Sequence, residues 1–278
     1  MIHAITTGYV KITEKWRKGE GKGLMRLANT LFDRQFSDWL PIWCYVIEHP
    51  DGLIVVDTGI SENANEPILF PPYMPLVQRA ARFKISKEEE IGTQMIARGL
   101  NPHDVRYVIL THLHQDHDGG LHHFPDAEFI VSHKEWDAAS GLVGRLSGYL
   151  NHCWFDGFSP TIIDFADEPI GAFPQSYSLL PDVILVPTYG HSTGHLSLIY
   201  QQEDQTFVFA GDMAYTDHAL YNRTLDGVTE DLDLAALSMQ QMSEFITAYD
   251  AVFLPSHDPE SANRLEAYLD EKAIFPAQ

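Results

Sequence analysis

The chain has 278 residues, of which 45% are hydrophobic, and a formal net charge of −21 from 39 acidic and 18 basic residues. This length allows one large core, and strand and helix patterns recur throughout, so we expect one α/β domain over residues 1–278. The acidic balance disfavours nucleic acid as a partner because it repels phosphate backbones. Since the chain has no long apolar run and no basic, apolar signal segment at its amino terminus, we expect no membrane span and a cytoplasmic location.

The first sixty residues predict three strands and one segment whose structure is left open. Residues 24–36 carry apolar residues at mixed spacing, which indicates either a short helix or a flap over a pocket. Asp57 ends the third predicted strand, a position from which a carboxylate can orient a nearby histidine. The predicted strands span residues 2–12, 42–48 and 53–57.

Four prolines interrupt residues 61–85, which predicts an irregular insertion near the site that acts as a flap or an oligomer contact. Beyond it, Ser86 and Glu89 have the spacing of a capping box. We therefore expect a helix that runs from there to Arg98 and ends at Gly99.

A β-branched run over residues 105–110 predicts a buried strand, and it leads directly into a cluster of imidazoles and carboxylates. Such side chains are good ligands for a divalent cation such as zinc. Alternate residues of an extended loop share a face, so the first two histidines can bind one ion while the adjacent Asp-His pair reaches a second. The alternative is a histidine-rich surface loop without metal, but the strand before it and the glycine pair after it favour a metal site. The cluster consists of His112, His114, Asp116 and His117.

The second half of the chain continues the alternation of strands and helices. Residues 140–165 are rich in glycine and aromatic residues and predict a second insertion or flap near the site, although each aromatic could equally pack in the core. We expect strands at 128–132, 182–187, 196–200, 206–210 and 250–254, helices at 134–139 and 234–249, and a short helix at the carboxyl terminus.

Further candidate ligands follow three of the later strands. His191 comes after the strand at 182–187, Asp212 after that at 206–210, and His257 after the last strand. A single histidine after a strand is usually an ordinary polar residue. Several such strand ends suggest one shared site, because ligands of α/β sheets bind at the carboxyl ends of the strands.

Together, the motif His112-x-His114-x-Asp116-His117 and the later residues His191, Asp212 and His257 resemble the ligand set of the dinuclear metallo-β-lactamase superfamily. The resemblance implies a four-layer αββα sandwich of the α/β (α+β) class that binds two divalent ions, zinc or else cobalt, manganese or iron. It implies that one metal is held by His112, His114 and His191, that the other is held by Asp116, His117 and His257, and that Asp212 bridges both. His195 lies outside this ligand set, and we expect it to pack or hydrogen-bond nearby.

Tyr215, three residues after Asp212, resembles the tyrosine that faces the substrate carbonyl in N-acyl-homoserine-lactone lactonases, the quorum-quenching lactonases. Residues 190–198 are also similar to the corresponding lactonase segment. Gln115 departs from the pattern, because some of these lactonases carry an aromatic residue there. The alternative for Tyr215 is a core or rim position without a catalytic role.

The resemblance implies hydrolysis of a small-molecule lactone, an N-acyl-homoserine lactone in particular, by attack of a metal-bridging hydroxide. Tyr215 would stabilise the developing negative charge, and Asp116 would deliver the proton to the leaving alkoxide. Two alternatives stay open: a hydrolase of the same fold acting on another ester, lactone or phosphotriester, and a metal-binding member without catalysis. Glyoxalase II carries a long helical part for glutathione at its carboxyl end. Only 21 residues (278 − 257) follow His257 here, so glyoxalase II is less favoured. A homodimer is left open.

Overall fold

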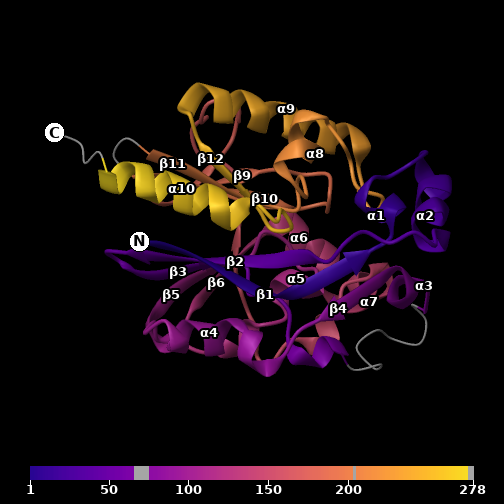
Figure 1. Cartoon of the computed structure of the whole chain (residues 1–278), viewed down its shortest axis with the longest axis horizontal. Helices are drawn as coiled ribbons and strands as arrows, with labels where there is room; N and C mark the ends of the chain where they lie inside the picture. The colour runs from indigo at the N-terminus through magenta and orange to yellow at the C-terminus, as the bar shows by residue number, and fades with distance from the viewer. Residues whose placement is uncertain (66–74, 203–204, 275–278) are drawn as a thin grey trace.

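The computed structural model describes residues 1–65, 75–202 and 205–274, which form two mixed β-sheets between layers of helices (Figure 1). Within these residues the larger sheet has seven strands in the order β4-β1-β2-β3-β5-β6-β7, and the smaller has five in the order β12-β11-β10-β9-β8. The larger sheet contains β1 (Ile2–Ile12), β2 (Leu40–His49), β3 (Gly52–Val56), β4 (Ala81–Lys84), β5 (Val105–Ile109), β6 (Glu128–Ser132) and β7 (Thr161–Ile163). The smaller contains β8 (Tyr177–Leu180), β9 (Val183–Pro187), β10 (Leu196–Gln202), β11 (Gln205–Gly211) and β12 (Val252–Pro255).

The helices are short except near the carboxyl terminus. The α-helices are α1 (Glu14–Arg17), α2 (Gly23–Phe32), α3 (Pro75–Ala80), α4 (Ile91–Ala97), α5 (Gln115–Asp118), α6 (His133–Ala139), α7 (Gly141–Ser147), α8 (Asp217–Tyr221), α9 (Leu232–Tyr249) and α10 (Ser261–Ile274). Single turns of 3-10 helix lie at Glu62–Asn65, Lys87–Glu89, Pro102–Asp104, Leu121–His123 and Asn151–Cys153.

The alternation of side chains along the strands produces the layers. In β2, Tyr45 and Ile47 point into the core between the two sheets, whereas Cys44 and Val46 point to the opposite face, where α4 packs. On the far side of the smaller sheet, α9 contributes Met242 to a third core. Helices therefore cover the outer face of each sheet, and the predicted four-layer αββα architecture is confirmed.

Two boundaries differ from the sequence-based expectation. The capping box at Ser86 and Glu89 is present, but it begins a 3-10 turn, and α4 starts only at Ile91 because Glu90 has extended backbone angles. The segment 61–85 was expected to be irregular. That expectation is wrong for its described part after residue 74, which forms α3 and then β4, an edge strand paired antiparallel with β1. Residues 66–74 lie outside the described residues.

The segment 140–165 has a mixed role. Tyr149, Trp154, Phe155 and Phe158 pack against the core on the outer face of the larger sheet, so these aromatics are structural. Ser147 and Gly148, by contrast, line the pocket that contains the predicted site residues.

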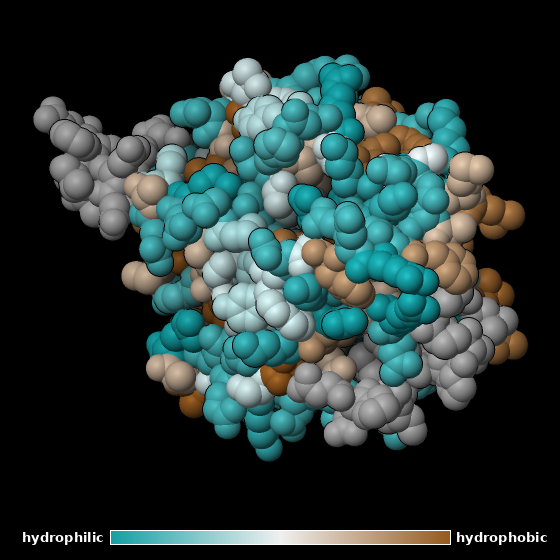
Figure 2. Space-filling model, turned by 45° about the vertical axis from the view of Figure 1, so that its right-hand side comes forward, coloured by the Kyte–Doolittle hydropathy of each residue, from teal (hydrophilic) through white to brown (hydrophobic). Residues whose placement is uncertain are grey.

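The surface agrees with the acidic composition. Hydrophilic residues predominate on the face shown in Figure 2, and hydrophobic ones gather toward its right-hand edge. Large apolar side chains are exposed on α2, where Leu24 is 86% and Phe32 61% accessible. Among the described residues, no helix has the length and apolar character needed to cross a membrane.

Candidate metal centre

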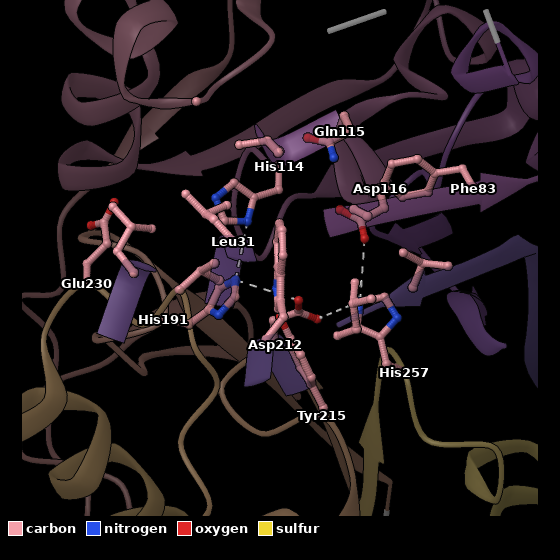
Figure 3. Close-up of a pocket in the computed structure, with 18 of the residues that line it drawn as sticks. Leu31, Phe83, His114, Gln115, Asp116, His191, Asp212, Tyr215, Glu230 and His257 are labelled. Atoms are coloured by element: carbon pink, nitrogen blue, oxygen red, sulfur yellow. Dashed lines mark hydrogen bonds and ion pairs between the residues drawn. The ribbon is translucent and has the colours of Figure 1, made fainter. Parts of the chain in front are cut away.

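The ends of four strands bring the seven predicted ligands together. The loop after β5 and the helix α5 that follows it carry residues 112–117, and the chain continues from β9, β11 and β12 toward His191, Asp212 and His257. Figure 3 shows Asp212 between His191 and His257, with His114 and Asp116 facing it across the pocket. The carboxyl ends of strands from both sheets thus converge on one group of ligand atoms.

The first cluster contains His112, His114 and His191. Nε2 of His112 lies 2.9 Å from Nδ1 of His114, and Nε2 of His191 lies 3.3 Å from the same atom. The ligand atoms of all three lie within 4.8 Å of one another. Three nitrogen donors at this separation can coordinate one cation.

The second cluster contains Asp116, His117 and His257. The Asp116 carboxylate lies 4.0 Å from Nε2 of His117 and 3.6 Å from Nε2 of His257. These ligand atoms also fall within 4.8 Å of one another, so the group can hold a second cation.

Asp212 lies between the clusters and presents one oxygen to each. Its Oδ2 is 3.6 Å from Nε2 of His191, and its Oδ1 is 3.3 Å from Nε2 of both His117 and His257. Its carboxylate can therefore bind both cations at once.

Two buried atoms of this group need a partner. Among the described residues, Nε2 of His117 and Oδ1 of Asp212 have no hydrogen-bond partner. An unsatisfied buried polar atom costs about 1–3 kcal/mol. A divalent cation between them would satisfy both, so the residues present fit the metal that the sequence predicts.

Hydrogen bonds at Nδ1 orient three of the histidines. His117 donates to Oδ2 of Asp57 (2.8 Å), His191 to Oδ2 of Asp226 (3.0 Å) and His257 to the backbone oxygen of Pro41 (2.9 Å). Each of these bonds places the ring proton on Nδ1 and leaves Nε2 free to bind a metal. Asp57 therefore contacts a histidine, as expected from its place at the strand end, whereas no sequence pattern pointed to Asp226.

The carboxylates divide the histidines into two electrostatic groups. Burial and the neighbouring imidazoles lower the pKa of His114 to about 3, and they lower the pKa of His112 well below its ordinary value. Burial alone would also lower the pKa of His191, but Asp226 and Asp212 together outweigh it and raise that pKa to about 9. In the same way, Asp212 and Asp57 raise the pKa of His117 despite its burial. Metal binding at these two must therefore displace protons, because the neutral ring is the ligand.

His195 supports Asp212 from outside the ligand set, as expected. The backbone N–H of Asp212 donates to Nε2 of His195 (3.0 Å), so the ring proton is on Nδ1, which donates to Oγ1 of Thr188 (2.8 Å). Burial and the nearby His191 lower the pKa of His195, which keeps the ring neutral.

Glu135, on α6, connects the two segments that carry the first cluster, 112–114 and 191–194, and no sequence pattern indicated this role. Its Oε1 accepts the backbone N–H of Leu113 (3.0 Å), which lies between His112 and His114. Its Oε2 accepts the hydroxyl of Ser192 (2.6 Å) and the N–H of Gly194 (3.0 Å), which follow His191 in the chain. The carboxylate is 1% exposed. Glu135 therefore fixes the spacing of the backbone that carries the first cluster.

Tyr215 lies beside both clusters and lines the pocket. Its ring centre is 5.9 Å from that of His191 and 5.3 Å from that of His257. Burial, Asp226 and Asp212 hold the pKa of its phenol well above the ordinary value, so the hydroxyl keeps its proton. Gln115 and Glu230 also line the pocket, and its apolar lining includes Val10, Ile12, Leu27, Leu31, Val77 and Phe83 (Figure 3).

The comparison with known proteins decides the family. The family model described as the metallo-beta-lactamase superfamily matches residues 37–257. The chain belongs to the metallo-beta-lactamase superfamily. Within this superfamily it is 30% identical over 224 residues to an N-acyl homoserine lactonase of Bacillus cereus, a match that covers 80% of this chain and 82% of the relative. It is also 28% identical to the N-acyl homoserine lactonase AttM of Agrobacterium fabrum over 80% of this chain and 83% of that protein.

Solved structures of this superfamily agree with the fold. An N-acyl homoserine lactone hydrolase with the product N-hexanoyl-L-homoserine bound at its catalytic metal centre matches with a TM-score of 0.75 and 26% identity, over 99% of this chain and 97% of that one. The family and the lactonase relatives together show that this chain is a metal-dependent hydrolase.

Proposed function

We propose that this chain hydrolyses lactones, with N-acyl-homoserine lactones as its substrates. The observation that carries the proposal is the position of Tyr215, which lines the pocket and whose ring lies beside one histidine of each ligand cluster. The similarity to N-acyl homoserine lactonases over 80% of the chain supports the same substrate class. The apolar wall that includes Leu31 and Phe83 suits the acyl chain of such a lactone.

We further propose that the centre holds two divalent ions. His112, His114 and His191 would hold one, Asp116, His117 and His257 the other, and Asp212 would bind both. Nitrogen and carboxylate ligands favour zinc, with cobalt, manganese or iron as alternatives. When bound, such a pair supplies Lewis acidity and makes hydroxide available near neutral pH.

The chain's own residues would then act on the lactone. Tyr215 donates its hydroxyl proton in a hydrogen bond to the carbonyl oxygen, which becomes negatively charged during attack, and one such donor is worth about 3 kcal/mol in the transition state. Asp116, which lines the pocket, would carry the proton of the attacking hydroxide to the alkoxide oxygen that leaves when the ring opens. The product is an open hydroxy acid.

A second candidate is the hydrolysis of another ester or of a phosphotriester at the same centre. It is favoured by Gln115, a polar residue in the pocket lining where some of the lactonases carry an aromatic residue.

The cytoplasmic location stays a prediction, and the homodimer stays an open possibility.

A substrate panel tests both candidates. A pH-drift assay of the zinc- or cobalt-loaded protein, with acyl-homoserine lactones of several chain lengths, simple esters, β-lactams and phosphotriesters, should show fastest turnover for the lactones. Intact lactones in the presence of metal-loaded protein would refute the substrate assignment. Tyr215→Phe should lower kcat about 100-fold with unchanged metal content, and a loss of metal in this variant would show that Tyr215 has a different role.

A further inference from the structure

Trp16, on α1, makes the one hydrogen bond that the Tyr215 hydroxyl forms with described residues. Its indole Nε1 donates to the tyrosine oxygen at 3.1 Å. Both side chains line the pocket, although they are 199 positions apart in the sequence. The contact therefore depends entirely on the tertiary fold.

The chemistry of the two groups fixes the direction of this bond. An indole N–H can only donate, so the tyrosine oxygen must be the acceptor. The phenol proton then points away from Trp16. Because no described residue accepts it, this proton is available to a molecule in the pocket.

The backbone around Trp16 holds the indole in place. The N–H of Trp16 donates to Oγ1 of Thr13 (3.2 Å), and its carbonyl accepts the N–H of Gly227 (2.6 Å). A Cβ on Gly227 would collide with Oγ1 of Thr30 and with the carbonyl of Lys15, so α1 lies directly against this glycine. Trp16 therefore cannot shift without disturbing the loop 225–230.

We propose that Trp16 is a positioning residue for catalysis: its indole N–H occupies a lone pair of the Tyr215 oxygen and thereby orients the phenol proton toward the substrate carbonyl. The proposal rests on the proposed function of Tyr215 as the donor to that carbonyl. Trp16 acts through Tyr215. Without its N–H, the hydroxyl can rotate to orientations in which it no longer donates to the substrate.

A double-mutant cycle separates this role from a structural one. Replacing Trp16 by 3-benzothienylalanine keeps the shape of the ring and exchanges the N–H for sulfur, and Trp16→Phe removes the N–H with natural residues. Each change should lower kcat about 3- to 10-fold, the value of one ordinary hydrogen bond. The isostere should leave KM within about twofold, since the pocket shape is retained. In a Tyr215→Phe background, neither change should lower kcat further.

Trp39→Phe is the matched control, because Trp39 is a surface residue outside the pocket lining. It should leave kcat unchanged. A readout independent of activity is the indole ¹H–¹⁵N resonance of Trp16, which should move upfield in Tyr215→Phe, whereas the other four of the five tryptophan signals stay in place.

Three results would overturn the proposal: an isostere with unchanged kcat, an equal loss of kcat with and without the Tyr215 hydroxyl, or an unmoved Trp16 resonance in Tyr215→Phe. Failure of the proposed function looks different. If the chain opens no lactone but hydrolyses another member of the panel, the lactonase assignment fails, and the same cycle on that substrate decides the role of Trp16. If it hydrolyses none of them, both fail.

Discussion

Glu135 offers the most direct test of how the first cluster is built. The carboxylate accepts three hydrogen bonds, one from Leu113 and two from the 192–194 segment, and it is buried. Burial raises the pKa of Glu135 although these donors favour its charged form. Removing the carboxylate therefore leaves the donors of Leu113 and of the 192–194 segment without an acceptor.

The expected cost follows from the number of donors left unpaired. In Glu135→Gln the single amide oxygen can accept hydrogen bonds either from Leu113 or from Ser192 and Gly194, but not from both segments. At least one buried backbone N–H then faces the amide NH₂ of the glutamine. One such unsatisfied group costs about 1–3 kcal/mol of unfolding free energy. Glu135→Ala leaves all three donors unpaired and adds a cavity, and we expect a loss of about 4–6 kcal/mol. Since the freed loops carry His112 and His191, metal affinity should fall about 10- to 100-fold.

The measurement combines urea unfolding with chelator competition for bound zinc, each at fixed zinc concentration because ligand binding itself shifts apparent stability. Glu244→Gln is the matched control: Glu244 is exposed on α9, and its carboxylate accepts only from Gln240 among the described residues. It should change neither quantity. If Glu135→Ala keeps the zinc affinity of the parent, the two loops do not depend on this carboxylate and the reasoning is wrong.

Two further predictions concern other carboxylates. Asp226→Asn should weaken zinc binding about 10-fold or more, because the Nδ1–H of His191 loses its charged acceptor; equal zinc affinity in chelator competition would contradict this. Glu90→Gln should lower stability by about 1–3 kcal/mol at pH 7, because Glu90 accepts from Ser61 and the N–H of Glu62 and pairs with His123. Burial would raise the pKa of Glu90, but these partners outweigh it and lower that pKa. The contribution of Glu90 to stability is therefore fully present above the ordinary pKa of a glutamate carboxyl group. It is lost as the pH falls through the lowered pKa that Glu90 has in the folded protein. The stability difference between parent and variant in urea unfolding should thus shrink below about pH 4, and a difference independent of pH would contradict the assigned cause.

The strands and the ligands could be predicted because their signals are local or repeated. The β-branched run before His112 marks β5, and the same pattern of a strand followed by a ligand recurs at β11 and β12. Helix boundaries were less predictable. The capping box at Ser86 occurs as expected, yet it begins only a 3-10 turn, because Glu90 has extended backbone angles, and the Glu90 side chain bonds to Ser61 and His123. Tertiary partners decided what the local pattern left open.

The supporting residues had no signal that a single sequence could reveal. Glu135 sits in a short helix after β6 and looks like any acidic helical residue until the 192–194 segment is placed against it. The sequence around Trp16 indicates only an aromatic residue of the core or of a loop, because its partner Tyr215 is 199 positions away. Such residues act through contacts between segments that are remote in the chain, and neither spacing nor composition records those contacts.

The loop 225–230 shows how closely these remote contacts are connected. Asp226 binds the His191 ring, and its backbone oxygen accepts from the guanidinium of Arg26 on α2 at 3.1 Å. The next residue, Gly227, donates to the carbonyl of Trp16. One short loop thus supports a proposed metal ligand on one side and the partner of the Tyr215 hydroxyl on the other. Both α1 and α2 contact this loop, and Trp16 of α1 also bonds directly to Tyr215. A change that detaches these helices should therefore disturb His191 and Tyr215 together, even though neither residue belongs to the amino-terminal segment.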